Sequence, residues 1–392
     1  MRRNTVFGQL MQLLSGHGFK QSVERYTGDR YTKSFSCWQQ LIVLLYSQAR
    51  GLNSLRDITV SLRSQRRKWY HLGLQSVARS TLADANSKRS ADIYKDVFYD
   101  FLGKCQSLAP GHKFRLKNPL YSMDSTLIKL CLSAFPWASY RKRKGAMKIH
   151  TLLAHKGCLP SFLTLTDGRC HDVKVVKDQR YGFPQLLPDS IITVDRGYYD
   201  FNWFYSLELG RVYFITRAKQ NLKYEVTGQQ KVPKNKGVIS DQTIRLTGSK
   251  PKQYYPKNLR LITFYDSKKE KELVFITNNF KLAASTIAEL YKHRWQIELF
   301  FKWIKQNLKI KTFLGTSENA VMTQIWTAFI YYLLLAFIKF QTRYAYSMHD
   351  LTRVIGETLM EHVDIIEVLR MKFEKLKLLK HNQPQLALSL IF

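Results

Sequence analysis

The residues best suited to chemistry lie together in the stretch from Tyr291 to Leu308. If this stretch is a helix that turns by about 100° per residue, four polar side chains fall within one arc of about 60°. They are Tyr291, Arg294, Glu298 and Lys305. An apolar stripe beside that arc consists of Leu290, Ile297, Phe301, Ile304 and Leu308. The predicted helix therefore has one edge that can pack and a neighbouring edge that can do chemistry.

The ordinary explanation of such an edge is a solvated surface with an ion pair between Arg294 and Glu298, which lie four residues apart. The aromatic content of the stretch argues against full exposure. The bulky aromatic residues are Tyr291, Trp295, Phe300, Phe301 and Trp303. A charge held among such side chains needs a partner. A metal ion or a phosphate would meet that need.

The spacing of the four polar residues resembles a known motif. Tyr, Arg, Glu and Lys, separated by two, three and six residues, form the Tyr-Arg-Glu-Lys motif of DDE transposases of the insertion-sequence-4 family. The resemblance implies a ribonuclease H-like catalytic core in which Glu298 is the third metal-binding carboxylate. In that fold the first aspartate lies on the first strand and the second lies just after the fourth strand.

Two upstream aspartates meet this requirement. A strand predicted over 120–130 carries Asp124 in its middle, and a buried strand predicted over 190–195 ends in Asp195. The Asp-Arg-Gly-Tyr-Tyr sequence that begins there resembles the family's second block. Taken singly, one aspartate could be a turn residue before a glycine and the other a chance polar residue in an edge strand. Their order with Glu298 favours a joint site.

The composition indicates a folded protein with a polyanionic partner. Among 392 residues, 45% are hydrophobic, and 62 Lys+Arg against 29 Asp+Glu give a formal charge of +33. Nucleic acid is the commonest polyanion bound by such a chain. A ribosomal or membrane-surface protein is the alternative, and it is less common for a chain this long and aromatic. The five cysteines form no C-x-x-C pair, so neither a disulfide framework nor a zinc site is indicated.

We expect a bacterial cytoplasmic protein associated with the nucleoid, with no membrane partner. The first residues lack the apolar segment of a secretion signal. The mostly apolar run 321–340 is long enough to cross a membrane. Polar residues interrupt it, namely Thr323, Gln324, Thr327 and Lys339. We therefore predict a buried core helix there.

The chain is expected to have an α/β fold with an all-α N-terminal DNA-binding domain. Residues 1–115 have helical patterns, with Ser54 and Ser80 predicted to cap helices in a helix-turn-helix arrangement beside the basic cluster Arg63–Lys68. The resemblance then implies a ribonuclease H-like catalytic core in two parts, a β-rich insertion between them and a C-terminal helical region. Their boundaries are 116–216 and 281–345 for the core, 217–280 for the insertion and 346–392 for the last region.

The insertion is predicted to be β-rich because strand-like runs at 243–247, 259–265 and 273–277 alternate with Lys-, Gly- and Pro-containing stretches. Family members use a tryptophan of the insertion to hold a flipped base, whereas no tryptophan occurs here between Trp203 and Trp295. Tyrosines of the segment could take the stacking role. The candidates are Tyr254, Tyr255 and Tyr265.

The resemblance implies a cut-and-paste DNA transposase that binds terminal inverted repeats and catalyses strand cleavage and strand transfer. Mg²⁺, for which Mn²⁺ can substitute, would be held by Asp124, Asp195 and Glu298. The residues expected on DNA phosphates are Tyr291, Arg294, Lys302 and Lys305, with the basic clusters Arg141–Lys144 and Arg63–Lys68 along the backbone. The expected partners are double-stranded DNA, as transposon ends and as target, and a second copy of the chain in a homodimeric synaptic complex.

Two other functions stay open. One is a nuclease of the same fold that cleaves DNA without transferring strands. The other is a non-catalytic DNA-binding protein derived from a transposase. A relic of the second kind usually loses a carboxylate, and this chain has all three.

Overall fold

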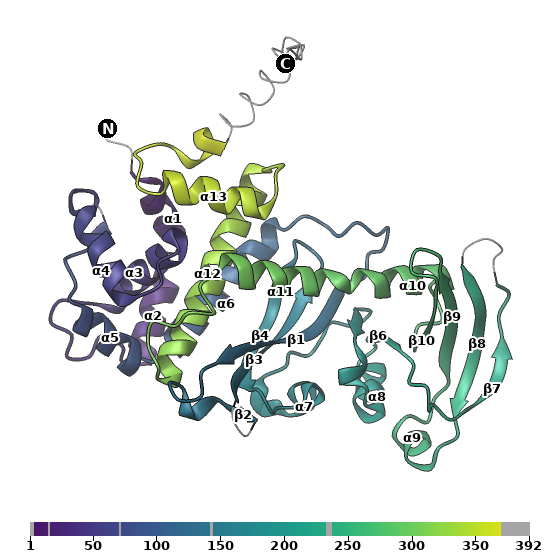
Figure 1. Ribbon diagram of the computed structural model, residues 1–392. Helices are drawn as coiled ribbons and strands as arrows, with labels where there is room; N and C mark the ends of the chain where they lie inside the picture. Colours follow the sequence, from purple (N-terminus) through teal and green to yellow (C-terminus); the bar gives the residue numbers. More distant parts are fainter. Residues whose placement is uncertain (1–3, 15, 70–71, 142–143, 233–236, 370–392) are drawn as a thin grey trace, which may run out of the picture. The chain divides into compact units, whose positions relative to one another are not determined.

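The computed structural model describes residues 4–14, 16–69, 72–141, 144–232 and 237–369 (Figure 1). The chain divides into two compact units, one made of Met1–Ala109 with Asn307–Phe392 and the other of Pro110–Gln306. The predicted division into consecutive domains differs from this arrangement. In the described part of the chain, the helices after residue 307 group with the N-terminal helices, whereas 346–392 was predicted as a region of its own.

In its described part, the first unit consists of helices and connecting turns. Its helices are α1 Val6–Leu14, α2 His17–Arg25, α3 Cys37–Arg50, α4 Leu55–Ser64, α5 Arg79–Lys88, α6 Asp92–Leu108, α12 Glu318–Thr342 and α13 Met348–Thr358, with a 3-10 turn η1 at Arg66–Lys68. The predicted helical character of the N-terminal region is thus present.

Helix α12 is the core of the first unit. It is apolar on all sides and packs against α3, α5 and α6 (Figure 1). A helix without a polar face is stable in water only when protein surrounds it. Among the described residues it is the one helix long and apolar enough to cross a membrane, yet 89% of its most apolar window is buried inside the fold. The prediction of a buried core helix over 321–340 is confirmed.

Of the two helix caps predicted in the N-terminal region, the one at Ser54 is confirmed. Gly51 ends α3 in the left-handed region with φ of 65°, and Ser54 Oγ accepts a hydrogen bond from the Asp57 amide at the start of α4. The predicted cap at Ser80 is wrong. Helix α5 begins at Arg79, so Ser80 lies inside the helix, and Ala78 at the capping position makes no side-chain cap hydrogen bond.

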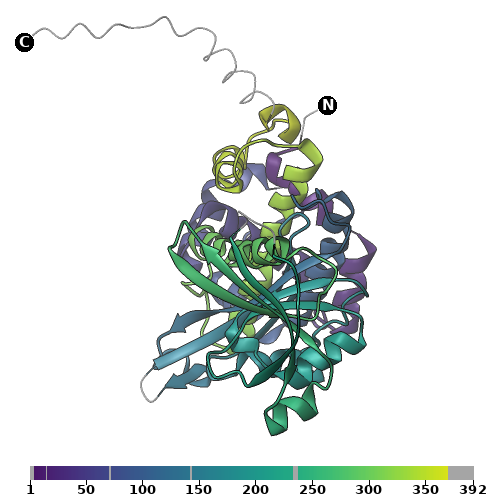
Figure 2. The same cartoon turned by 90° about the vertical axis from the view of Figure 1, so that its right-hand side faces the viewer.

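The second unit is built on one ten-stranded sheet with the order β2-β3-β1-β5-β6-β10-β9-β8-β7, and β4 pairs with β3 outside this path. The neighbours β1, β5 and β6 run parallel, and all other pairs are antiparallel (Figure 2). The strands are β1 Leu120–Leu130, β2 Ser139–Arg141, β3 Lys144–Ala154, β4 Leu159–Asp167, β5 Ile191–Val194, β6 Tyr213–Arg217, β7 Tyr224–Gln229, β8 Val238–Leu246, β9 Leu259–Asp266 and β10 Lys271–Thr277.

The predicted β-rich segment is present, and its strands extend this sheet. Strand β10 pairs with β6, with Ile276 opposite Thr216. Strands β9, β8 and β7 follow outward from β10. Strand β7 was absent from the predicted strands because its side chains are mostly exposed and show no apolar alternation.

Helices cover both faces of the sheet. They are α7 Asp172–Lys177, α8 Phe201–Leu209, α9 Ser249–Tyr254, α10 Ala284–His293 and α11 Trp295–Asn307. One apolar core lies between the sheet and α7 with α8, and a second lies between the sheet and α10. Leu120 and Ile191 point into the second core. Side chains alternate along a strand, so every second residue points to the same face. Asp124 lies four residues after Leu120, and Asp195 lies four residues after Ile191, so both aspartates belong to the face that α10 covers.

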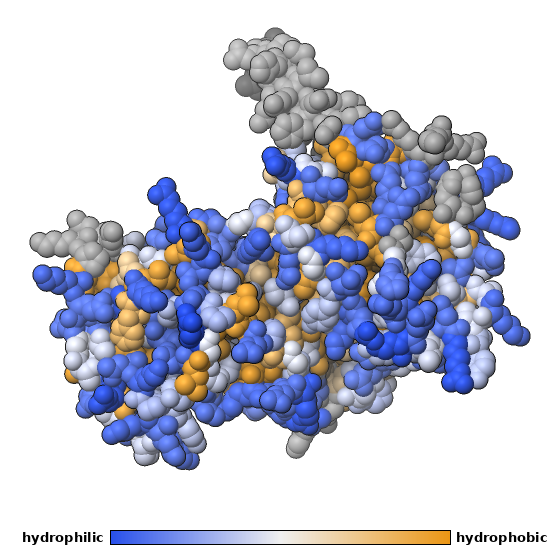
Figure 3. All heavy atoms as spheres, turned by 180° about the vertical axis from the view of Figure 1, so that it is seen from behind, coloured by the Kyte–Doolittle hydropathy of each residue, from blue (hydrophilic) through white to orange (hydrophobic). Residues whose placement is uncertain are grey.

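The surface is mostly hydrophilic on the face drawn in Figure 3, with scattered apolar groups. The large apolar side chains that are exposed come from both units, for example Val60, Leu187 and Trp295. Single exposed apolar residues are normal for soluble proteins. The basic cluster predicted at 141–144 lies outside the residues whose side chains are described.

Candidate active site

Tyr291, Arg294 and Glu298 lie on two consecutive helices rather than on one. Helix α10 ends at His293 and α11 begins at Trp295. The Arg294 amide donates to the Tyr291 carbonyl at 3.1 Å, a bond that spans only three residues and tightens the turn. The predicted continuous helix is therefore wrong at this residue. The backbone of Arg294, with φ of −51° and ψ of −29°, is still helical, so the side chains of Tyr291, Arg294 and Glu298 stay on one side of the two helices.

Three elements bring three carboxylates to this side. Asp124 lies in the middle of β1, Asp195 follows directly after β5, and Glu298 lies in the first turn of α11. Strands β1 and β5 are parallel neighbours, and Ser122 pairs with Thr193 in their register. Asp124 lies two residues after Ser122, and Asp195 lies two residues after Thr193. Alternation and register together place them next to each other.

Asp124 carries an unfavourable charge. Its side chain is only 17% exposed. Burial and the neighbouring Asp195 raise the pKa of Asp124 to about 6, while the Ser125 amide and Arg294 act in the opposite direction and Glu298 adds to the rise. The Ser125 amide donates to Asp124 Oδ1 at 2.8 Å. The other oxygen of the carboxylate is left for charged partners.

Asp195 is held in the same manner. The Gly197 amide donates to Asp195 Oδ1 at 2.8 Å, which makes the aspartate the cap of a short 3-10 turn, η5 Arg196–Tyr198. Burial raises the pKa of Asp195, and Asp172 and Glu298 add to the rise. The Gly197 amide and Arg294 act in the opposite direction. A side chain at 197 would crowd two carboxylates, because a Cβ there would lie 3.0 Å from Asp195 Oδ1 and 3.1 Å from Asp172 Oδ2.

Arg294 joins two of the carboxylates. Its Nη1 lies 3.1 Å from Asp124 Oδ2 and its Nη2 lies 2.6 Å from Glu298 Oε1. The guanidinium is 14% exposed, and its Nε is buried without a hydrogen-bond partner. Burial lowers the pKa of Arg294, but Asp124, Tyr291 and Glu298 outweigh it and raise the pKa above its ordinary value. The ion pair that the spacing of Arg294 and Glu298 allows thus exists, but it is mostly buried and shared with Asp124, unlike the solvated edge of the ordinary explanation.

The donor set suits a hard divalent cation. Carboxylate oxygens are the ligands that Mg²⁺ prefers. Neighbouring carboxylates raise the pKa of both Asp124 and Asp195, so a cation between them would relieve this repulsion. Among the described residues, no three His, Cys, Asp or Glu side chains are gathered closely enough to hold one ion in this arrangement. Arg294 occupies the oxygens of Asp124 and Glu298. The guanidinium and a metal ion would compete for them.

The remaining predicted residues lie along the same helices. Tyr291 packs against Phe275 with tilted rings whose centroids are 4.9 Å apart, and the Arg294 guanidinium carbon lies 5.8 Å from the Tyr291 ring centre. Lys302 is exposed on α11 and Lys305 is half-buried one turn later. The structure therefore brings Tyr291 and Arg294 together with the carboxylates, while both lysines lie further along α11.

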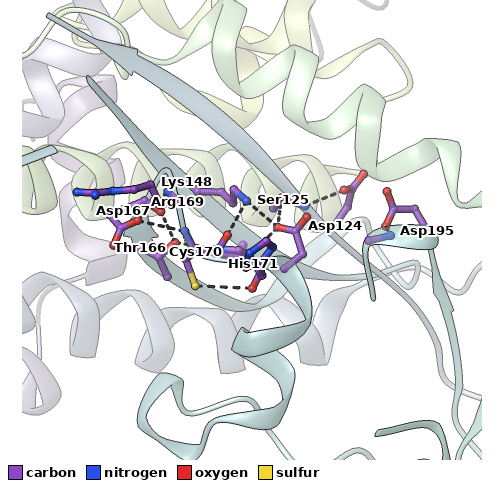
Figure 4. A network of polar contacts seen from close by, with 12 residues as sticks. Asp124, Ser125, Lys148, Thr166, Asp167, Arg169, Cys170, His171 and Asp195 are labelled. Atoms are coloured by element: carbon purple, nitrogen blue, oxygen red, sulfur yellow. Dashed lines mark hydrogen bonds and ion pairs between the residues drawn. The ribbon is translucent and has the colours of Figure 1, made fainter. Parts of the chain in front are cut away.

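A second polar network adjoins the carboxylates and was not predicted from the sequence (Figure 4). Asp172 Oδ1 accepts hydrogen bonds from Ser125 Oγ at 2.7 Å and from Lys148 Nζ at 3.1 Å. The Lys148 ammonium also donates to the Cys170 carbonyl at 2.7 Å, and His150 Nδ1 lies 3.6 Å from the same Asp172 oxygen. No spacing pattern relates these residues, because they come from β1, β3 and the start of α7.

A basic pocket of about 440 Å³ was also missed. Its cations are Arg196, Arg217, Lys219 and Lys271, and one acidic residue, Glu272, lines it with them. Arg217 Nε is buried without a hydrogen-bond partner. Burial raises the pKa of the Tyr291 hydroxyl, and the nearby Arg217 opposes that rise. The one sequence signal was Arg196, which directly follows Asp195.

Burial separates the three tyrosines proposed to stack on a base. Tyr255 is 1% exposed, lies in an apolar core and donates a hydrogen bond to Glu208 at 3.3 Å, so its ring cannot stack on DNA in this fold. That prediction is wrong for Tyr255. Tyr254 and Tyr265 are 45% and 43% exposed and stay candidates.

Two family models match the chain. One is described as "Transposase DDE domain" and matches residues 115–334, a range that includes all three carboxylates. The other is described as "Domain of unknown function (DUF4372)" and matches residues 2–75.

Relatives match along most of the chain. A protein of Sinorhizobium fredii named as transposase y4zB is 30% identical over 299 residues, which cover 75% of this chain and 81% of that protein. A protein of Geobacillus stearothermophilus named as a transposase for insertion sequence element IS5377 is 30% identical over 277 residues, or 69% and 70% of the two chains. A Synechocystis protein named as a transposase for insertion sequence element IS4SA is 23% identical over 366 residues, or 91% and 97%.

Proposed function

This chain belongs to the DDE transposase family, and on that premise we propose that Asp124, Asp195 and Glu298 form its catalytic site for cleaving and transferring DNA strands. As a member of the family, the chain is a DNA transposase of an insertion sequence. One observation carries the assignment. Three carboxylates from β1, β5 and α11 face one partly buried site, where Asp195 and Glu298 raise the pKa of Asp124 and Glu298 raises the pKa of Asp195.

The order of the elements supports a ribonuclease H-like core. Asp124 lies on the first strand of the sheet, and Asp195 follows β5, which is the fourth strand when the three-residue β2 is left out. Glu298 lies on a later helix. This is the arrangement that the Tyr-Arg-Glu-Lys resemblance implied.

Asp124, Asp195 and Glu298 are the residues that would hold Mg²⁺, with Mn²⁺ as a substitute. When bound, such ions activate the attacking oxygen and stabilise the leaving oxygen of a phosphodiester. The amides of Ser125 and Gly197 each fix one oxygen of an aspartate. Fixed oxygens favour in-line displacement because the ligands need not reorganise during the reaction.

The cations around the carboxylates are suited to DNA phosphates. Arg294 can bind a phosphate with two nitrogens, and Tyr291 beside it can donate a hydrogen bond. Lys302 and Lys305 extend the basic edge along α11. The pocket of Arg196, Arg217, Lys219 and Lys271 would hold the backbone of the same strand without reading its sequence.

Helices of the first unit would recognise the transposon ends. Helices α4 and α5 pack against each other, as the two helices of a helix-turn-helix do. The basic 3-10 turn at Arg66–Lys68 follows α4 and contains no buried residue. The partners are then terminal inverted repeats and target DNA in a homodimeric complex, and the site of action is the bacterial nucleoid in the cytoplasm.

The test measures nicking of a labelled transposon end by Asp124→Asn, Asp195→Asn and Glu298→Gln proteins in Mg²⁺ and in Mn²⁺. Each substitution should lower nicking by about 1,000-fold or more, which corresponds to about 4 kcal/mol of barrier. DNA binding in a gel-shift assay should be kept or strengthened, because negative charge facing a phosphate is removed. Near wild-type nicking in Mg²⁺ by any variant would remove that residue from the site.

The alternative of a nuclease without strand transfer is tested with the same substrate. A transposase joins the cleaved 3′ end to a target plasmid, and the joined product is visible on a gel. Cleavage without any joined product would favour the nuclease. An absence of both, with DNA binding intact, would favour a non-catalytic DNA-binding protein.

A further inference from the structure

We propose that Asp172 is a positioning residue that sets the placement of both catalytic aspartates from the opposite face of the sheet. The inference rests on the proposed function of Asp124 and Asp195. Asp172 is the first residue of α7. It accepts a hydrogen bond from Ser125, the neighbour of Asp124, and lies beside Gly197, two residues after Asp195. It is itself not one of the residues assigned to metal or DNA.

One oxygen of Asp172 acts on Asp124 through Ser125. Asp172 Oδ1 accepts the Ser125 hydroxyl at 2.7 Å, and the Ser125 amide donates to Asp124 Oδ1 at 2.8 Å. Adjacent residues of a strand point to opposite faces. Asp172 therefore holds Ser125 from the α7 face, and the backbone of Ser125 holds Asp124 on the α10 face.

The other oxygen of Asp172 lies beside Gly197, the residue whose amide holds Asp195. Asp172 Oδ2 lies 3.1 Å from the point where a Cβ of residue 197 would be, and Asp195 Oδ1 lies 3.0 Å from that point. The Gly197 amide is the donor to Asp195 Oδ1. The same carboxylate thus adjoins both residues whose amides orient the catalytic aspartates.

The surroundings of Asp172 favour a fixed position. Its side chain is 24% exposed, and the Lys148 ammonium that pairs with it is 14% exposed. His150, which is fully buried on β3, pairs in register with Ser125 and lies beside the same oxygen. A partly buried ion pair with further hydrogen bonds holds one geometry, because breaking it would leave a buried charge without a partner.

Residues that hydrogen-bond to metal ligands affect how tightly the metal is bound. Removing such an outer group typically costs about 10- to 100-fold in metal affinity or activity. We therefore expect Asp172→Asn and Ser125→Ala to weaken metal binding by about that factor. Ser125→Thr keeps the hydroxyl and should stay near wild type. Asp178→Asn is the matched control, since Asp178 lies on the same segment and pairs with the exposed Arg180.

The experiment measures Mn²⁺ binding to the full chain by calorimetry without DNA, together with the Mg²⁺ concentration for half-maximal nicking. Thermal unfolding is recorded for every variant. Asp172→Asn leaves the Lys148 ammonium without its carboxylate partner. Adding Lys148→Met removes that ammonium, so the double variant should be more stable than Asp172→Asn but should bind Mn²⁺ no more tightly. Recovered stability with weak Mn²⁺ binding would show that Asp172 positions the aspartates, whereas a merely structural role would make stability and Mn²⁺ binding recover together.

The outcomes are distinct. Weaker Mn²⁺ binding in Ser125→Ala and Asp172→Asn, with Ser125→Thr and the Asp178 control unchanged, supports the proposal. Wild-type Mn²⁺ affinity in folded Asp172→Asn and in Ser125→Ala overturns it. If Asp172→Asn does not fold, the two Ser125 variants decide. Unchanged Mn²⁺ binding in Asp124→Asn would instead overturn the proposed metal site itself.

Discussion

Replacing Asp124 by asparagine should abolish nicking and also stabilise the fold in the absence of divalent ions. Folding raises the pKa of Asp124 from its ordinary 3.8 to about 6, mainly through burial and then through Asp195. A shift of about two units at about 1.4 kcal/mol each amounts to about 3 kcal/mol. The ionised carboxylate therefore destabilises the folded chain by about that amount relative to a neutral side chain of the same shape.

The sign of the pH dependence follows from the raised pKa. A carboxyl group that binds its proton more tightly in the folded state stabilises that state fully below pH 3.8, and the contribution is lost as the pH rises through about 6. Asparagine is neutral throughout. The variant should be more stable than the wild type by about 3 kcal/mol at pH 7.5, by about half of that near pH 5, and by nothing below pH 4.

The assay is urea unfolding in buffer with a metal chelator at several pH values. For a unit of this size, about 3 kcal/mol corresponds to a rise of about 6–12 °C in Tm, so thermal unfolding gives a second reading. Asp178→Asn is the control, because Arg180 lowers the pKa of Asp178 to about 2 and no gain at pH 7.5 is expected there. The reasoning is refuted if Asp124→Asn gains the same stability at pH 4 as at pH 7.5, or if it loses stability at pH 7.5.

Three further predictions concern the cations and the first unit. Arg294→Ala should bind Mn²⁺ at least as tightly as wild type without DNA, because the guanidinium no longer competes for Asp124 and Glu298, but its end complexes should be weaker in gel shifts; weaker Mn²⁺ binding would contradict this. Arg217→Gln or Lys219→Gln should each reduce the slope of log affinity against log salt by about 0.9 if it contacts one phosphate, and an unchanged slope would remove the residue from the DNA path. A fragment ending at residue 115 should be insoluble or unfolded because it lacks α12, and a cooperative unfolding transition of that fragment would show otherwise.

Patterns local to the chain were predictable from the sequence. The strand over 120–130 and the apolar run ending at Asp195 are visible because alternation and apolar runs depend on neighbours along one strand. The helix end at Gly51 and the cap at Ser54 depend on residues within one turn. The Tyr-Arg-Glu-Lys spacing named the family, and both the family and the transposase function are shown by the comparisons.

Contacts between distant parts of the chain were decided only by the tertiary structure. Chain order does not state that α12 lies among the N-terminal helices, or that β10 pairs with β6 and so joins the insertion to the core sheet. Burial of Tyr255 has the same origin, since its ring faces α8 from a segment with no apolar pattern.

The site shows the same division between local and long-range information. The sequence by itself determined which three carboxylates are candidates and that Arg294 lies one helical turn before Glu298. Only the fold decided that Arg294 also reaches Asp124, 170 residues away along the chain, and that Asp172 adjoins both residues whose amides orient the aspartates. The physical reason is that spacing controls which side chains share a face of one element, whereas strand register and helix packing control which faces meet.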